Sequence, residues 1–213
     1  MQMPDERDSG RVALDATRSA EVFAREGCVV LRSLVANPKL ALLHRYALMR
    51  AVRGTMNLQD AEFLGTPSAY SDPFMDGLLI ELLPLIERVS GVRLFPTYSY
   101  VRIYKRGDVL AKHSDRPACE ISVTLSLGYE ADRPWPLWIE AVGGSASVSL
   151  APGDALLYRG IELFHWRDAF DGHHSAQVFL HYVNQNGPNA EWRFDKRSSL
   201  APSLPARTRS ADE

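Results

Sequence analysis

One short pattern in the sequence contains residue types that could hold a metal ion. His113 and Asp115 are separated by a single serine, and His165 follows fifty positions after Asp115. Side chains alternate along a β-strand, so a histidine and a carboxylate two positions apart lie on the same side of it. Two imidazoles and one carboxylate on one face of a metal leave three coordination positions open, which is a ligand set suited to Fe(II). We therefore treat His113, Asp115 and His165 as candidate metal ligands.

The pattern His-x-Asp is short and recurs by chance, so it does not identify a metal site on its own. A second group of histidines, His173, His174 and His181, lies in the segment HHSAQVFLHY. Its spacing matches no ligand pattern, and no carboxylate accompanies it in the sequence. We expect these three histidines to pack or to contact a substrate rather than to bind a metal.

The elements that must position these residues divide the chain into a helical half and a strand-rich half. Apolar residues recur at helical spacing in three early segments, two of which are followed by Gly27 and Gly91 as C-terminal caps. The segment CVVLRSLV is β-branched and predicts a strand between the first two helices. In the second half, short segments alternate with period two and are separated by Gly, Pro and Asp. This order predicts an α+β domain in which the helices cover one outer face of an antiparallel sandwich or barrel. The three helical segments are 17–26, 38–52 and 71–90.

The length of 213 residues suits one domain. We expect a single domain over residues 17–197, with a helical part at about 17–92 and a barrel at about 93–185. Polar composition predicts a flexible N-terminus at residues 1–16 and a disordered tail at residues 198–213.

Composition and charge exclude several classes of partner. A formal net charge of -2 gives no basic footprint for nucleic acid or an anionic membrane. No apolar run reaches the roughly 20 residues that a membrane span needs, and the first fifteen residues lack the apolar core of a signal peptide. Cys28 and Cys119 have no paired spacing, which argues against a disulfide scaffold and a cysteine-rich zinc site. We expect a cytoplasmic protein.

The sequence around the candidate ligands resembles the Fe(II)/2-oxoglutarate-dependent oxygenases of the prolyl-hydroxylase-like and phytanoyl-CoA-dioxygenase-like groups. The segments that carry the resemblance are YVRIYKRGDVLAKHSD, APGDALLYRGIELFHWRDAF and REGCVVLRSLV, within about residues 18–185. The resemblance implies a double-stranded β-helix, that is, a jelly-roll or cupin-like barrel, with His113, Asp115 and His165 holding iron. It also implies 2-oxoglutarate and O2 as co-substrates, hydroxylation of an unactivated C–H bond, release of succinate and CO2, and ascorbate as a stimulant in some members.

The sequence departs from the family where the distal carboxylate of 2-oxoglutarate should bind. Relatives carry Arg or Lys nine to ten residues after the distal histidine, but His174 and Ser175 occupy those positions here. Arg167 lies two residues after His165 and should face the same side of the strand, and its planar fork suits a carboxylate. We expect Arg167 to take over this role, with hydrogen bonds from Ser175 and Gln177. The alternative is a surface ion pair between Arg167 and Asp168 or Asp171; the weaker substitutes are Lys112, Arg116 and Arg102.

Two further questions stay open at the level of sequence. Tyr104 matches the position where relatives place a tyrosine beside the co-substrate, but it could equally be a packed strand residue. The same barrel also occurs in cupin-like isomerases and in binding modules without oxygenase activity, because a fold does not fix a function. A small molecule or amino acid is the expected substrate and a peptide side chain the alternative, with specificity from a lid at residues 57–72. The oligomeric state is not predicted.

Overall fold

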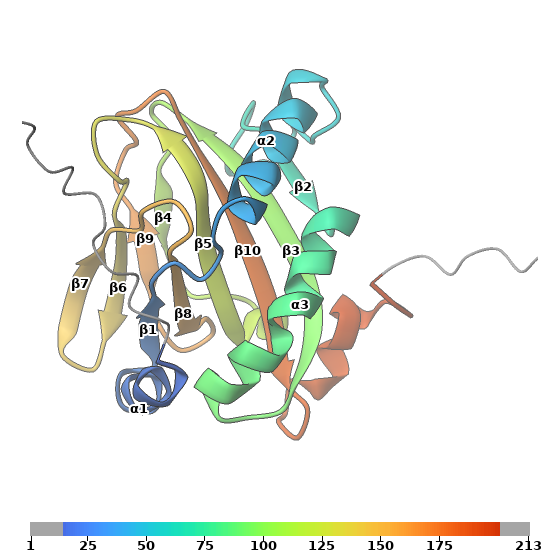
Figure 1. Cartoon of the computed structure of the whole chain (residues 1–213), viewed down its shortest axis with the longest axis vertical. Helices are drawn as coiled ribbons and strands as arrows, with labels where there is room; N and C mark the ends of the chain where they lie inside the picture. Colours follow the sequence, from blue (N-terminus) through green and yellow to red (C-terminus); the bar gives the residue numbers. More distant parts are fainter. Residues whose placement is uncertain (1–14, 201–213) are drawn as a thin grey trace, which may run out of the picture.

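The computed structural model describes residues 15–200 as an α+β arrangement of helices packed on a large antiparallel sheet (Figure 1). The predicted flexible N-terminus and disordered tail, residues 1–16 and 198–213, fall mostly outside the described residues. The helices are α1 (Ala16–Glu26), α2 (Lys39–Val52) and α3 (Pro73–Ser90), with two short 3-10 segments, η1 (Pro117–Cys119) and η2 (Ala190–Lys196).

The first and third helices begin and end where local chemistry places them. Asp15 precedes α1, and its side chain accepts hydrogen bonds from two backbone N–H groups of the first turn. Asp72 caps α3 in the same way, and Pro73 occupies the first position, where its missing N–H costs nothing. Both helices end at a glycine with positive φ, 74° at Gly27 and 76° at Gly91. None of the helices in residues 15–200 is long and apolar enough to cross a membrane.

The strands form two antiparallel sheets. The larger sheet has the order β1-β8-β5-β10-β3-β2, and the smaller has the order β4-β9-β6-β7. The strands of the larger sheet are β1 (Cys28–Leu31), β2 (Ser68–Tyr70), β3 (Leu94–Lys105), β5 (Ile121–Glu130), β8 (Ala155–Arg159) and β10 (His174–Asn184). Those of the smaller sheet are β4 (Leu110–His113), β6 (Leu137–Ala141), β7 (Gly144–Val148) and β9 (His165–Arg167).

Strand β10 shows how the larger sheet separates its two faces. Ala176, Val178 and Leu180 are fully buried in the core that the helices cover. The alternate residues, which include Phe179 and His181, point into the space between the two sheets. The sheet therefore has an apolar face for the helices and a mixed face for a cavity.

Candidate metal centre

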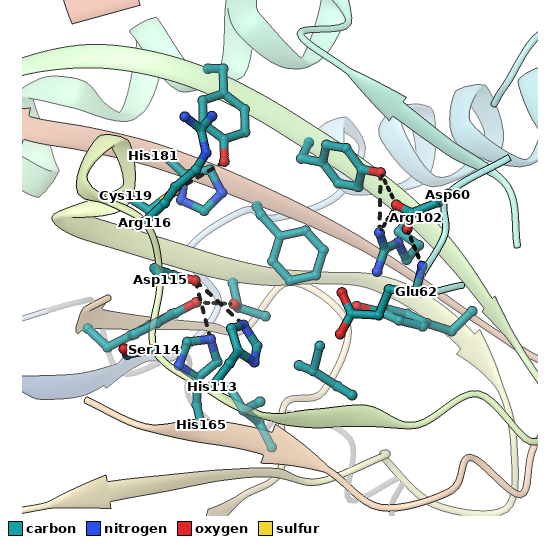
Figure 2. A pocket seen from close by; sticks show the side chains of 18 residues that line it. Asp60, Glu62, Arg102, His113, Ser114, Asp115, Arg116, Cys119, His165 and His181 are labelled. Carbon is teal, nitrogen blue, oxygen red and sulfur yellow. Dashed lines mark hydrogen bonds and ion pairs between the residues drawn. The ribbon is translucent and has the colours of Figure 1, made fainter. Parts of the chain in front are cut away.

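The structure brings His113, Asp115 and His165 together at one end of the space between the sheets (Figure 2). His113 ends β4 and His165 begins β9, and the two are direct partners in the antiparallel pairing of these strands. Oδ1 of Asp115 lies 3.7 Å from Nε2 of His113 and 3.6 Å from Nε2 of His165. The three ligand atoms that the sequence singled out therefore converge on one point.

Backbone carbonyls fix the orientation of both histidines. Nδ1 of His113 lies 2.8 Å from the Ala111 carbonyl, and Nδ1 of His165 lies 3.0 Å from the Leu163 carbonyl. A carbonyl only accepts, so Nδ1 carries the proton in each ring and Nε2 presents a lone pair. Two imidazole lone pairs and a carboxylate that face one another can share a bound metal ion.

The pKa values of these groups follow from burial and from their mutual contact. Contact with Asp115 raises the pKa of His113. Burial lowers the pKa of His165. Burial alone would raise the pKa of Asp115, but His113, His181 and His165 together lower it, and the carboxylate is ionised. A metal entering this site meets an anionic aspartate.

A chain of hydrogen bonds behind Asp115 was not foreseen from the sequence. Ser122 Oγ donates to Oδ2 of Asp115 at 3.0 Å and lies 2.9 Å from Nδ1 of His181. Burial lowers the pKa of His181 to about 4, so the ring is neutral. With Oδ2 held by Ser122, Oδ1 is the oxygen that faces the two ligand histidines.

Gly160 confines Asp115 from the other side. Its carbonyl accepts a hydrogen bond from the Asp115 backbone N–H at 2.8 Å. A Cβ at Gly160 would come within 2.3 Å of both Asp115 Oδ2 and the Cys119 carbonyl oxygen. Only glycine fits here, because the space beside the carboxylate is already filled.

The three residues border a cavity of about 450 Å³ that both sheets line. Its walls combine charged and polar residues with aromatic and apolar ones, and the latter include Tyr98, Tyr104, Leu137, Tyr158 and Phe179. Such a volume suits a small molecule rather than a folded partner. Tyr104 is fully buried, with its ring packed edge-on against Trp135 at 4.9 Å.

Further charged residues border the cavity, with Asp60, Glu62 and Arg102 together on one side and Arg116 beside Cys119 and His181 (Figure 2). Arg102 pairs with Asp60 at 2.5 Å, and Arg116 forms two contacts of 2.8 Å with Asp195. Glu62 also lines the cavity, and it has no ion pair among the described residues. Asp60 and Glu62 lie in the predicted lid, residues 57–72, which therefore contributes two carboxylates to the cavity.

Arg167 lies inside the protein, not at its surface. Its guanidinium donates to the Trp135 carbonyl and, at 2.9 Å, to Oε1 of Gln177, and Gln177 Nε2 lies 3.3 Å from Ser175 Oγ. Burial lowers the pKa of Arg167 to about 10. Within residues 15–200 it pairs with no carboxylate, so neither proposed surface pair, with Asp168 or Asp171, is formed. Arg167 is not among the residues that border the cavity directly, whereas Arg102 is.

The other basic substitutes are engaged elsewhere. Lys112 pairs with Glu140 beside the rings of Phe164 and Trp166. Arg116 is held by Asp195, as described above.

The second histidine group does not stay together in the structure. His181 lines the cavity, whereas His173 and His174 lie near the start of β10 beside Glu130. The carboxylate that the sequence did not reveal is therefore supplied by the end of β5. His174 and His181 are an odd number of positions apart, so strand alternation turns them to opposite faces of the sheet.

Comparison with known proteins finds similar solved structures but no similar sequences. No protein-family model matches the sequence, and no curated protein matches it. The prolyl-4-hydroxylase of Pseudomonas putida has 14% identity, a TM-score of 0.67, and coverage of 79% of this chain and 98% of that chain. The epimerase SnoN, solved with Fe3+, alpha ketoglutarate and nogalamycin RO, has 12% identity, a TM-score of 0.69, and coverage of 91% of each chain.

A third neighbour is EctD from S. alaskensis, solved with 2-oxoglutarate and 5-hydroxyectoine. It has 15% identity and a TM-score of 0.65, with coverage of 86% of this chain and 79% of that chain. All three neighbours share an overall fold with this chain at identities too low to carry more than the fold. The chain therefore has the fold of the Fe(II)/2-oxoglutarate-dependent oxygenases, as the resemblance in its sequence predicted.

Proposed function

We propose that this protein is an Fe(II)- and 2-oxoglutarate-dependent dioxygenase that hydroxylates an unactivated C–H bond of a small molecule and releases succinate and CO2. The two sheets would form the double-stranded β-helix of such enzymes. The observation that carries the proposal is the convergence of His113, Asp115 and His165 beside a solvent-accessible cavity of about 450 Å³. Two imidazoles and one carboxylate with open positions are the ligand set of non-haem Fe(II) oxygenases.

His113, Asp115 and His165 would hold the iron. When bound, Fe(II) supplies the activation of O2 that no amino-acid side chain provides. The chain itself contributes orientation, because Ala111 and Leu163 carbonyls aim the imidazoles and Ser122 holds the far oxygen of Asp115. The aromatic residues of the cavity wall, such as Tyr158 and Phe179, would exclude water from the reacting centre once a substrate fills the cavity.

Arg167 would bind the distal carboxylate of 2-oxoglutarate, assisted by Tyr104, Ser175 and Gln177. A fully buried guanidinium with only neutral partners is costly, and an incoming carboxylate offsets that cost. Arg167 and His165 are two positions apart on β9 and lie on the same side of the strand. A carboxylate bound by Arg167 would therefore lie on the same side of β9 as the iron. Because Arg167 does not border the cavity, a small rearrangement of Gln177 or Trp135 must accompany binding.

The nature of the substrate is the less constrained part of the proposal. The cavity volume favours a small molecule, and EctD and SnoN were solved with small molecules bound. Because one structural neighbour is a prolyl-4-hydroxylase, a peptide side chain is the alternative substrate. An epimerase and a carbocyclase among the structural neighbours also leave other outcomes of C–H activation open. A cupin-like isomerase or binding module is the alternative that needs no 2-oxoglutarate at all.

Anaerobic titration of the Fe(II)-loaded protein with 2-oxoglutarate tests the proposal. A visible charge-transfer band should develop in the wild type and be absent in Asp115→Ala. Arg167→Met should need at least ~30-fold more 2-oxoglutarate to develop the band, since removing one member of a buried charge pair costs about 2–5 kcal/mol. Arg102→Met is the matched control for loss of a guanidinium from the same cavity region.

Each outcome has a definite reading. If the protein bound iron but no charge-transfer band developed, the proposed oxygenase activity would be rejected. The cupin-like isomerase or binding module would then be favoured. A band that forms equally well in Arg167→Met but poorly in Arg102→Met would transfer the carboxylate-binding role to Arg102.

A further inference from the structure

A second set of two histidines and one carboxylate lies at the other end of the larger sheet. Glu130 ends β5, and His173 and His174 lie at the start of β10. We refer to these three residues as the outer triad. Oε2 of Glu130 lies 3.4 Å from Nδ1 of His173 and 3.6 Å from Nδ1 of His174, and the two Nδ1 atoms are 3.4 Å apart.

These separations match those of ligands around a small tetrahedral ion. Zinc binds imidazole nitrogen and carboxylate oxygen at about 2.0–2.2 Å, which places tetrahedral ligands roughly 3.3–3.5 Å apart. A carboxylate oxygen and two imidazole nitrogens also repel one another through their lone pairs unless a proton or a metal ion lies between them. The outer triad therefore has the ligand spacing of a tetrahedral metal site, and a metal ion is one of the two species that would remove this repulsion.

The backbone fixes the outer triad, although two of its side chains are exposed. His174 and Glu130 are direct partners in the pairing of β10 with β5, and the His173 N–H donates to the Glu130 carbonyl at 2.7 Å. The side chains of His173 and Glu130 are 76% and 70% exposed, whereas that of His174 is 19% exposed. An ion could reach the site from solvent without any opening of the fold.

His174 is constrained from its inner side. Its ring stacks on His44 of α2 with ring centroids 5.8 Å apart, and its Nε2 is buried with no hydrogen-bond partner among residues 15–200. With Nε2 enclosed in this way, Nδ1 is the nitrogen available to a ligand, and it faces Glu130. Asp132 and Asp171 border the same surface groove as Glu130 and His173, and they provide further oxygen donors close by.

The outer triad is separate from the candidate iron site. Ser122, which contacts Asp115, and Glu130 stand eight residues apart on β5, roughly 25 Å at strand spacing. The two sites share no residue, so occupation of one does not require the other.

We propose that the outer triad binds a divalent transition-metal ion of the zinc type. Such an ion joins the end of β5 to the start of β10, with water completing its coordination. Imidazole and carboxylate together suit Zn2+, and a site that is open to solvent selects by donor type rather than by enclosure.

Titration of the metal-free full-length chain with Zn2+ alone tests the proposal. The experiment uses an Asp115→Ala, His165→Ala background, which leaves the candidate iron site with one of its three ligands. This protein should still bind one Zn2+ per chain. Adding His174→Ala or Glu130→Gln should weaken that binding by at least ~100-fold, since loss of a direct ligand exceeds the 10–100-fold cost of losing a supporting partner. His44→Phe, which keeps a ring against His174, is the control and should retain binding.

Co2+ provides a second readout in the same proteins. A tetrahedral nitrogen and oxygen set gives visible absorption without the thiolate charge-transfer band that Cys119 would add, and this absorption should disappear with His174→Ala. Zinc binding that survives both His174→Ala and Glu130→Gln would overturn the proposal. So would a background protein that binds no Zn2+ stoichiometrically at micromolar concentrations. Circular dichroism checks that each variant is folded.

Discussion

The candidate iron site and the outer triad contain the same donors in opposite surroundings. Each has two histidines and one carboxylate with ligand atoms less than 4.8 Å apart. In the candidate iron site, His165 and Asp115 have side-chain exposures of 4% and 13%, whereas Glu130 and His173 in the outer triad are mostly exposed. The third ligands differ less, since His113 is 37% exposed and His174 is 19% exposed. The two sites therefore have the same kinds of ligand atoms, and any difference in their function must come from the residues around them.

The difference lies in what stands behind each ligand. Carbonyls of Ala111 and Leu163 set the ring orientation in the iron site, and Ser122 holds Asp115. In the outer triad, the described residues offer no hydrogen-bond partner to the buried Nε2 of His174, and apart from the two histidines they hold Glu130 through its backbone alone. A supported ligand set beside a cavity suits chemistry, because its open positions face a space that a substrate can fill. An unsupported set at the surface suits binding alone.

The largest contrast is expected from removing the carboxylate of each site. Asp115→Ala should lower 2-oxoglutarate-dependent succinate formation by more than ~10³-fold, because the iron loses its anionic ligand. Glu130→Ala should leave this rate within about twofold. Succinate release under O2 measures both. Equal losses in the two variants would break the distinction between a catalytic and a surface site.

Arg167→Met tests whether the buried cation serves a ligand or the fold. A pKa lowered from 12.5 to about 10 corresponds to about 3 kcal/mol against the charged form. The two acceptors left behind cost about 1–3 kcal/mol each. These terms oppose one another, so the free energy of unfolding without 2-oxoglutarate should change by less than ~2 kcal/mol.

The same variant should lose most of its response to the co-substrate. At 2-oxoglutarate concentrations 100-fold above Kd, the Fe(II)-loaded wild type should gain about 2.7 kcal/mol. Arg167→Met, with at least ~30-fold weaker binding, should gain no more than about 0.9 kcal/mol at the same concentration. Denaturant unfolding with and without 2-oxoglutarate measures both effects. An apo variant that is destabilised by several kcal/mol would make Arg167 a structural residue.

Burial of His181 should make the free energy of unfolding depend on pH. Its pKa is lowered from 6.5 to about 4 by burial, so the folded protein binds fewer protons than the unfolded chain between these values. Stability contributed by the neutral ring is therefore present above about pH 6.5 and is lost as pH falls toward 4, by up to about 3 kcal/mol. His181→Phe should flatten the decline in unfolding free energy over this interval. Parallel curves for the variant and the wild type would contradict the assignment.

Ser122→Ala should have the smallest effect. It tests whether the hydrogen bond behind Asp115, which has no counterpart behind Glu130 among the described residues, strengthens metal binding. Losing the hydrogen bond to Oδ2 of Asp115 should weaken Fe(II) binding by about 10-fold, the lower end for a supporting partner. Ser126→Ala is the matched control, since Ser126 lies four residues along β5 on the same face and is also buried. Competition with a chelator measures both affinities. If the two variants bound Fe(II) equally, Ser122 would not support the ligand.

The sequence predicted the parts of the molecule that depend on local patterns. The ends of the first and third helices followed from caps and glycines, and His113, Asp115 and His165 followed from their spacing together with the resemblance of the surrounding segments to a known family. Arg167 was expected inside because it lies two positions from His165, and the structure places it there. Ser122 and Glu62 could not be found in this way, because their roles depend on which distant strand or loop lies opposite them. Glu130 was missed for the same reason, since only the pairing of β10 with β5 brings it to His173 and His174.

The crowded position of Gly160 determines which changes the protein can tolerate. Even alanine there would displace the carboxylate of Asp115, although Gly160 has no side chain and contacts neither cavity nor metal directly. Random mutagenesis should therefore reveal a strict requirement at a residue that carries no reactive group. A survey of tolerated substitutions would detect the ligand site through the space around it as well as through the ligands themselves.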